Sequence, residues 1–381
     1  MNRDPNFDFY SLRPEQETPA EQSEPTVDAG QGASDTAKAP AAPLFAFPRP
    51  DREAVRATRH AFSRVGWAFF AMMFVWYASA LVLENAFAAQ DLPSWFSMLS
   101  STLPLYVFGM PALLLFMIGL PRRAPQRQAF GKGAWLVALT VAFLGMLGGT
   151  LIGNAIMSNL SLITGYSFEN AVEALFDIPL WVSTLLSVVL APVFEELIFR
   201  KLMIDRLLPF GEWTAILVPA ILFGAMHGNL YQLFYAIAIG LVCGYVYVRS
   251  GKWSLCVAIH AIVNLVCGVF PTYIQSQIDL EAFSELAATA SDPTVLLSFV
   301  SQHLVGFGLL LLYDLILYGA AITGLVLLIV HRRKIRLEPT EMELPRGFRV
   351  TPALLNGGIV ASLCVSGLLV LLSLIVSAVP M

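Results

Sequence analysis

Charged residues are scarce in this sequence: Asp, Glu, Lys and Arg make up 13% of its 381 residues, while hydrophobic residues make up 57%. A water-soluble domain carries about 25% charged residues. Several apolar runs also exceed the roughly 18 residues that indicate a transmembrane helix. The composition therefore excludes a water-soluble domain. It predicts an all-α, polytopic bundle of about eight to nine transmembrane spans, with the lipid bilayer as its partner and no role for nucleic acid.

Cysteine is also sparse. All four cysteines lie within apolar runs, and no two of them have CxxC spacing. We interpret each one as a small residue in helix packing, and not as half of a disulfide or as a zinc ligand. They are Cys243, Cys256, Cys267 and Cys364.

Polar connections between the apolar runs define the predicted organisation. Nine candidate spans lie near residues 62–83, 99–120, 133–157, 179–208, 213–230, 231–249, 253–270, 303–330 and 352–380. Residues 1–48 are rich in Pro, Glu, Gln and Ser and predict a disordered cytoplasmic tail, because they cannot bury enough apolar surface to offset their ordering entropy. Residues 49–61 predict a basic juxtamembrane helix on the lipid surface, since their arginines recur at helical spacing.

The rest of the chain is divided by the same pattern. Residues 62–132 hold the first two spans, and residues 331–351 are expected to form a basic cytoplasmic linker before a final transmembrane helix in 352–381. The third span has Gly145, Gly149 and Gly153 at intervals of four residues. Small residues at this spacing allow helices to approach closely, so we assign these glycines to helix packing.

Lysine and arginine are absent from the connections 84–98, 158–178 and 271–299, which contain acidic residues instead. The positive charges cluster at Arg49–Arg64, Arg122–Lys132, Arg200–Arg206, Arg249 with Lys252, and His331–Arg336. Cytoplasmic connections are enriched in Lys and Arg. Nine spans with a cytoplasmic N-terminus place every basic cluster inside and every acidic connection outside. We therefore expect an integral membrane protein with its C-terminus outside. The composition of the tail and the alanine-rich apolar runs favour a bacterial plasma membrane.

Charged residues within the spans mark a candidate site, because charges at membrane depth are costly and tend to be functional. The stretch 191–207, APVFEELIFRKLMIDRL, contains Glu195, Glu196 and Arg200. Residues four apart share a helix face, so Glu196 and Arg200 can form a pair that leaves Glu195 unpaired on a neighbouring face. Taken alone, the glutamates could equally bind basic partners at the cytoplasmic rim.

Two histidines lie well inside apolar runs, and each has a polar or aromatic partner four residues away. Phe223 precedes His227, and His260 precedes Asn264. A rise of 1.5 Å per residue places Glu195 and His227 roughly 20 Å, and His260 roughly 10–12 Å, from the cytoplasmic ends of their helices. We expect these polar residues to meet in one cavity that opens to the cytoplasm.

This set of side chains suits hydrolysis. Burial favours the neutral form of a carboxylate and so makes it a useful general base near neutral pH. We expect Glu195 to take a proton from a water that His227 orients, while His260 and Asn264 donate hydrogen bonds to the developing oxyanion. No serine or cysteine beside the histidines forms an evident nucleophile motif, so water is the expected attacker and no cofactor is required.

A metal-dependent alternative uses the same residues. Glu195, His227 and His260 could ligate zinc and leave a fourth position for water, with Glu196 as the base. The chain contains no HExxH motif, so the usual argument for a zinc protease does not apply. Both mechanisms remain open at this point. Asp314, in the eighth predicted span, is expected to be hydrogen-bonded within the bundle.

These elements together resemble the CPBP family, which comprises the CAAX proteases and bacteriocin-processing enzymes and is also called the type II CAAX prenyl endopeptidase or Abi family. The resemblance covers roughly residues 130–270 and, with the eighth span, predicts a protease core over 133–330. It implies an α-helical intramembrane endopeptidase in which the first Glu of EExxxR is the catalytic carboxylate. The three motifs EExxxR, FxxxH and HxxxN appear here as Glu195-Glu196 to Arg200, Phe223 to His227, and His260 to Asn264.

The resemblance implies a membrane-embedded or lipidated polypeptide substrate, either a prenylated CAAX protein or a leader-bearing peptide. We expect Glu196 and Arg200 to support the catalytic residues electrostatically. One rival is a non-catalytic immunity or scaffold protein of the same fold, which the intact motifs disfavour. A transporter is another, since intramembrane acids and histidines also relay protons. The absence of a clear internal repeat disfavours it.

Overall fold

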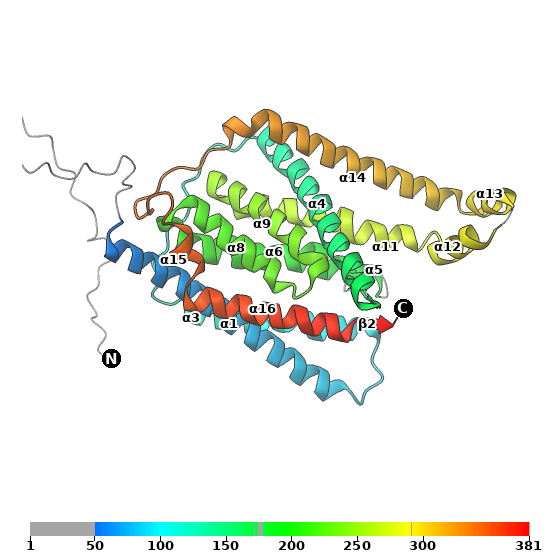
Figure 1. Cartoon of the computed structure of the whole chain (residues 1–381), viewed down its shortest axis with the longest axis horizontal. Coiled ribbons are helices and arrows are strands. Elements are labelled where there is room, and N and C mark those ends of the chain that lie inside the picture. The colour runs from blue at the N-terminus through cyan, green and yellow to red at the C-terminus, as the bar shows by residue number, and fades with distance from the viewer. Residues whose placement is uncertain (1–49, 171, 174–177, 291, 381) are drawn as a thin grey trace, which may run out of the picture.

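Long apolar helices dominate the computed structural model, which describes residues 50–170, 172–173, 178–290 and 292–380. Within these residues, eight helical stretches are long and apolar enough to cross a membrane. They confirm the predicted all-α polytopic bundle, in which Figure 1 shows α14 and α16 along the length of the molecule and α4 crossing obliquely. The predicted disordered tail, 1–48, lies outside the described residues.

The first half of the chain forms four of these stretches. Its elements are α1 (Arg52–Phe87); α2 (Ser94–Pro104), η1 (Leu105–Gly109) and α3 (Met110–Phe116); α4 (Lys132–Thr164); and a broken helix made of α5 (Leu180–Thr184), η3 (Leu185–Leu190), α6 (Ala191–Glu196), η4 (Leu197–Ile204), α7 (Asp205–Leu207) and η5 (Leu208–Phe210).

The second half begins with a close helical hairpin and ends beside α1. Its elements are α8 (Glu212–Met226), α9 (Leu230–Ser250), α10 (Trp253–Asn264) with η6 (Leu265–Val269) and α11 (Phe270–Gln275), α12 (Leu280–Thr289), α13 (Pro293–Gln302), α14 (Leu304–His331), η7 (Arg332–Lys334), α15 (Val350–Leu354) and α16 (Gly357–Val376). Two short strands, β1 (Tyr166–Phe168) and β2 (Ala378–Pro380), pair antiparallel with Tyr166 opposite Pro380.

The fifth predicted span is a shorter helix than the others. α8 has 15 residues, which is about 22 Å at 1.5 Å per residue. The chain enters it through Gly211 (φ 125°) and reverses after it at Gly228 (φ 62°). Only glycine adopts such backbone angles without strain, so these two residues allow α8 and α9 to form a tight hairpin.

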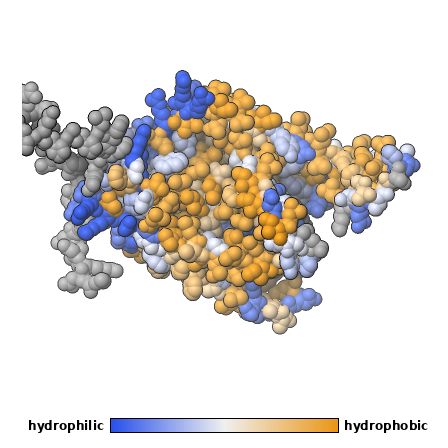
Figure 2. Space-filling view, in the orientation of Figure 1, coloured by the Kyte–Doolittle hydropathy of each residue, from blue (hydrophilic) through white to orange (hydrophobic). Residues whose placement is uncertain are grey.

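The two ends of the bundle differ in charge. We call the end that carries Arg52, Arg122, Arg249 and the segment 331–349 the basic end, and the opposite end, where β1, β2, α12 and α13 lie, the acidic end (Figure 1). Between them, Figure 2 shows a broad hydrophobic face flanked by hydrophilic surfaces. Large exposed side chains on α4, α14 and α16 contribute to the apolar surface. The bilayer is therefore the medium that covers the middle of the bundle.

The predicted basic juxtamembrane helix, 49–61, is not a separate element. Arg52, Arg56 and Arg59 lie in the first turns of α1, which runs without a break from Arg52 to Phe87. Ala57 and Ala61 are buried rather than placed on a lipid surface. No proline interrupts the sequence between the arginines and the apolar run, so nothing ends the helix there.

A buried carboxylate holds the basic end together. Asp205 is fully buried, and its side chain meets Arg122 and Lys201, both at 3.0 Å, and the Tyr247 hydroxyl at 2.6 Å. Its backbone carbonyl also accepts a hydrogen bond from the Arg123 N–H. Asp205 therefore links the connection before α4 to α7 and α9.

Three proline residues coincide with π-helical turns. η1, η3 and η6 each end two residues before a proline, namely Pro111, Pro192 and Pro271. Proline lacks an N–H and its ring clashes with the preceding turn. A widened turn with i→i+5 hydrogen bonds accommodates the ring without ending the helix. These residues therefore keep three membrane helices continuous but leave backbone carbonyls without their usual donors.

Glycines bring α4 and α9 into close contact, as their spacing predicted. A Cβ atom added to Gly153 would lie 2.9 Å from the Leu230 carbonyl oxygen, and one added to Gly149 would overlap the backbone of Tyr235. Gly145 faces Ala238 in the same way, with 2.9 Å to its Cβ. The polar residues of α9 are therefore held at a fixed distance from α4.

Gly149→Ala tests this packing. We expect it to destabilise the protein by about 1–3 kcal/mol, because the backbone of α9 must move away. Gly148→Ala is the matched control, since its added Cβ has no atom within 4 Å. Thermal unfolding of both variants in detergent measures the effect, and equal transition temperatures would contradict close packing at Gly149.

Candidate active site

An internal cavity of about 260 Å³ brings the predicted polar residues together. Glu195 reaches it from α6, His227 from the end of α8, and His260 and Asn264 from α10. These four side chains come from three separate stretches of sequence. Their shared cavity agrees with the juxtaposition that their helical spacing and depth predicted.

Glu196 and Arg200 form the expected ion pair within one helical stretch. The guanidinium donates to both carboxylate oxygens, with Nε–Oε2 at 2.7 Å and Nη2–Oε1 at 3.2 Å. Both side chains are completely buried, and neither lines the cavity. They therefore support the site from behind and do not face a substrate.

His260 connects this ion pair to the cavity. Its Nδ1 lies 3.1 Å from Oε1 of Glu196, and its Nε2 lies 3.8 Å from Oε2 of Glu195. A carboxylate only accepts hydrogen bonds, so Nδ1 carries a proton that it donates to Glu196. This bond fixes the ring and directs Nε2 to Glu195.

Asn264 is held by a backbone carbonyl that a proline has freed. Its Nδ2 donates to the Ser187 oxygen at 2.8 Å. In η3 the N–H of Ala191 bonds to Leu186, and the next bond of this series would join residue 192 to Ser187. Pro192 has no N–H, so the Ser187 carbonyl is available to Asn264.

Phe223, the aromatic residue of FxxxH, packs between three motif side chains. Its ring meets the rings of His227 and His260 edge to face, at centroid distances of 5.3 and 5.6 Å. The Arg200 guanidinium lies 5.5 Å from the same ring centroid, within cation–π range. Phe223 thus contacts both histidines and helps to hold their rings in place.

His227 is oriented by its own helix. Its Nδ1 lies 2.9 Å from the Phe223 carbonyl oxygen, and because a carbonyl only accepts, Nδ1 is the donor. The remaining nitrogen, Nε2, is therefore unprotonated in the neutral ring and can accept a hydrogen bond from a water in the cavity.

The sequence predictions missed several polar residues of the cavity wall. Tyr106, Gln232 and Tyr235 all line it. Gln232 Nε2 donates to the Tyr235 hydroxyl at 2.8 Å, so the hydroxyl proton of Tyr235 remains available. The i, i+3 spacing of Gln232 and Tyr235 at the start of an apolar run was a signal that could have identified them.

Buried side chains pack on the basic side of the site, and the opening of the cavity to the cytoplasm stays a prediction. Ile198, Phe199, Met203, Tyr247 and Cys256 lie on the basic side of the site, and each is completely buried. The depth calculation counted residues along single helices. It could not show that side chains from neighbouring helices fill this space.

The alternative zinc set is not assembled. Among the described residues, the one group of three His, Cys, Asp or Glu ligand atoms within 4.8 Å of one another is Glu196 with Cys243 and Cys256. Zinc ligands at 2.0–2.3 Å from the metal require closer donors than Glu195, His227 and His260 provide. These three residues do not fit a zinc ion as they stand.

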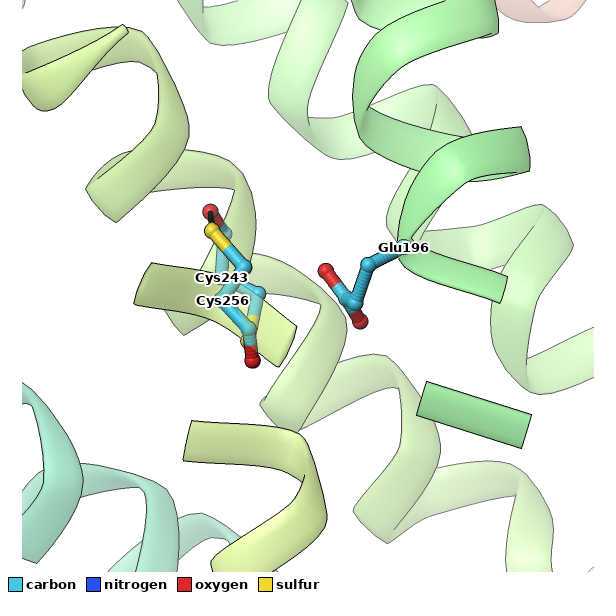
Figure 3. Close-up of side chains that lie close together, drawn as sticks. All are labelled: Glu196, Cys243 and Cys256. Atoms are coloured by element: carbon cyan, nitrogen blue, oxygen red, sulfur yellow. Dashed lines mark hydrogen bonds between the residues drawn. The ribbon is translucent and has the colours of Figure 1, made fainter. Parts of the chain in front are cut away.

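The group formed by Glu196, Cys243 and Cys256 lies beside a cation, the Arg200 guanidinium. Figure 3 shows Cys243 and Cys256 on one side of the Glu196 carboxylate, which is paired with Arg200 on another. Each thiol is directed to the other cysteine's backbone carbonyl, with Cys256 Sγ at 3.2 Å from the Cys243 oxygen. Both cysteines are free and buried, in agreement with a packing role. The charge of Arg200 disfavours a metal ion here.

Asp314 does not have the hydrogen bond that we expected. It is half-buried on α14, and within the described part of the chain its side chain has no hydrogen-bond or ion-pair partner. It also lies outside the cavity wall. The sequence placed Asp314 near the middle of a membrane span, but it did not show which face of the helix carries the side chain.

A polytopic helical bundle with a carboxylate, two histidines and an asparagine around an intramembrane cavity defines the class of this protein. A family model described as "Type II CAAX prenyl endopeptidase Rce1-like" matches residues 177–266, which include all three motifs. This segment therefore belongs to the CPBP, or CAAX protease, family. No curated protein matches the chain, and no solved structure matches it.

Arg200→Met tests the buried ion pair. We expect a loss of about 3–5 kcal/mol of stability, because Glu196 would remain buried as an anion without its main partner. The double variant Glu196→Gln/Arg200→Met should be more stable than Arg200→Met, because it no longer buries an unpaired anion. Thermal unfolding in detergent measures both, with Arg59→Met, at an exposed site on α1, as the control. A double variant less stable than Arg200→Met would contradict the interpretation.

Proposed function

We propose that this chain is an intramembrane endopeptidase of CAAX type that uses a glutamate and a water molecule. The family match supports an endopeptidase in general terms. The observation that carries the mechanism is the position of Glu195, which lines the cavity while Glu196 alone takes the Arg200 ion pair. Glu195 is thus the carboxylate that is available to act as the general base.

In the proposed reaction, Glu195 removes a proton from a water that His227 Nε2 orients. The water oxygen bonds to the scissile carbonyl carbon, and the electron pair moves to the carbonyl oxygen. Glu195 then passes the proton to the leaving nitrogen as the C–N bond breaks, which yields a carboxylate and an amine. Water is consumed and the base is regenerated.

Two donors are available for the oxyanion. Asn264 Nδ2 has two protons, and its bond to Ser187 uses one of them. His260 must carry a proton on Nε2 as well as on Nδ1, so it acts as an imidazolium beside the carboxylates of Glu195 and Glu196. Donors placed before the reaction stabilise the oxyanion without reorganisation.

The proposed substrate is a membrane-embedded or lipidated polypeptide. The cavity wall is largely apolar, with Trp76, Leu105, Met146 and Ile239 among its residues. Such a wall suits an extended apolar segment. A prenylated CAAX sequence and a leader peptide both meet this description. The alternatives to the proposed function are a zinc-dependent protease and a non-catalytic scaffold, and the next experiment distinguishes them.

Glu195→Gln should abolish cleavage and preserve the fold, since the amide cannot accept the proton; a general base contributes about 10²–10⁴ in rate. Glu196→Gln should reduce cleavage partly, because it acts through His260. A quenched library of lipidated and unlipidated peptides, incubated with purified protein in detergent, measures both variants. Equal residual activity in the two would contradict these roles.

Wild-type protein treated with a metal chelator is assayed for cleavage beside the variants. Unchanged cleavage supports the water mechanism, whereas loss that zinc reverses would make Glu195 a metal ligand. A wild-type protein that cleaves no peptide of the library would contradict the peptidase proposal and favour a scaffold.

Pro192→Ala tests the positioning of Asn264. The new N–H can bond to the Ser187 carbonyl and compete with the Asn264 amide. We expect kcat to fall about tenfold at unchanged KM, because small misplacements of reacting groups are costly, while thermal stability is kept. Pro111→Ala, which follows η1 in the same way, is the control. Equal kcat in both variants would show that Pro192 does not position Asn264.

A further inference from the structure

A chain of hydrogen bonds runs along the cavity wall at the start of α9. Asn229 Nδ2 donates to the His227 carbonyl oxygen at 3.0 Å and to Gln232 Oε1 at 2.7 Å. Asn229 Oδ1 accepts the Gln232 N–H at 2.9 Å, and Gln232 Nε2 donates to the Tyr235 hydroxyl at 2.8 Å. Because both protons of Asn229 Nδ2 are used, Gln232 has to present its oxygen to them. The orientation of both amides is therefore fixed.

Three hydrogen-bonding groups of this wall are left over. One Nε2 proton and one Oε1 lone pair of Gln232, and the hydroxyl proton of Tyr235, have no partner among the residues that the structure describes. Both side chains line the cavity. Capping α9 requires only the Asn229 side chain, so the cap does not account for the free groups. They are available to a molecule that enters the cavity.

A peptide in this cavity needs such partners. Each of its residues brings one N–H and one C=O, and leaving either group unpaired away from water is costly. Most of the wall cannot pair with them, because it is apolar, as at Leu105, Met146 and Ile239. Asn264 also has an amide, but the proposed reaction uses it for the oxyanion. The free donor and acceptor of Gln232 complement the C=O and N–H of one peptide residue.

These side chains are held in place before any substrate binds. The backbone of Tyr235 packs against α4 at Gly149, where an added Cβ would overlap it. Asn229 is buried, and the chain turns directly before it at Gly228 (φ 62°). Groups that are already ordered lose little conformational entropy on binding. The start of α9 is thus a preorganised surface for hydrogen bonds.

We infer that Gln232 and Tyr235 bind the substrate backbone at one residue beside the scissile bond. In an extended chain, the N–H and C=O of one residue point to the same side. Gln232 Oε1 accepts this N–H, Gln232 Nε2 donates to this C=O, and the Tyr235 hydroxyl donates to the second lone pair of the same oxygen. The inference rests on the proposed peptidase function and deepens it, because the site then recognises an extended backbone.

The chain of hydrogen bonds also gives the position of this residue. Asn229 joins the Gln232 amide to the backbone of His227, and His227 Nε2 orients the attacking water in the proposed reaction. The bound residue therefore lies next to the point of attack. Gln232 and Tyr235 hold the substrate there and take no part in proton transfer.

Binding can be measured without cleavage, in the Glu195→Gln background. The probe is a fluorescent peptide of alternating leucine and alanine with blocked ends, and its anisotropy in detergent is compared with that in empty micelles. In a series of isosteric analogues, an ester oxygen replaces one backbone N–H at a time. We expect Gln232→Leu to raise Kd of the all-amide peptide about tenfold, because two hydrogen bonds are lost.

The ester analogues separate direct contact from a structural effect. For the one analogue that already lacks the N–H facing Gln232, Gln232→Leu should raise Kd only about threefold, since one hydrogen bond remains to be lost. An equal loss for every analogue would overturn the inference. So would an all-amide peptide that binds the parent protein no better than it binds empty micelles.

Tyr235→Phe is the milder variant, because it removes a single oxygen and keeps the ring. We expect it to raise Kd of the all-amide peptide about threefold. Tyr231→Phe is the matched control on the same helix, since the Tyr231 hydroxyl donates to the Phe168 carbonyl at 2.8 Å and the residue does not line the cavity. Equal Kd values for the two variants would contradict a contact between Tyr235 and the substrate.

Cleavage kinetics give a second readout. With a peptide that the wild type cleaves, Gln232→Leu and Tyr235→Phe should raise KM at unchanged kcat, because the backbone contact is the same in the ground state and the transition state. A lower kcat at unchanged KM would overturn a binding role. Gln232-dependent binding by a protein that cleaves no peptide would support this site and contradict the peptidase proposal. Cleavage whose KM does not depend on Gln232 would overturn this site and support the peptidase proposal.

Discussion

A buried anion bound by one guanidinium and one imidazole N–H is the constraint on which the site depends. Glu196 cannot remain charged inside an apolar bundle without partners, and it obtains them from Arg200 on its own helix and His260 on α10. This arrangement joins α6 and η4 to α10 and settles the direction of the His260 ring. It also leaves Glu195 as the one carboxylate of the pair that faces the cavity. Stability and the chemistry of the site thus have the same origin.

A second constraint is that backbone polar groups must be satisfied inside a membrane. The prolines after η1, η3 and η6 remove hydrogen-bond donors from helices that nevertheless remain continuous. At η3 the free carbonyl of Ser187 is used to hold Asn264. A local irregularity of one helix therefore becomes a positioning contact for another. Pro192 thus has two effects: it requires the widened turn of η3, and it leaves the Ser187 carbonyl to bind Asn264.

The packed basic end relates the fold to the proposed function. Asp205, Tyr247 and the segment 332–349 join the ends of several helices, so this end acts as a rigid base beneath the site. The Glu196–Arg200 pair is completely buried and does not line the cavity, so the packed side chains keep it away from solvent.

The sequence alone determined the helical class, the Glu196–Arg200 pair and the juxtaposition of the motif residues. These follow from composition and from the 3.6-residue helical repeat, which are local properties. Only the tertiary structure decided that Phe223 contacts both histidines, and that the helix beginning at Arg52 continues without a break into the first apolar run. It also showed that Asp314 lacks the expected partner. Those features depend on which side chains of distant segments fill the same space, and spacing along one helix contains no information about its neighbours.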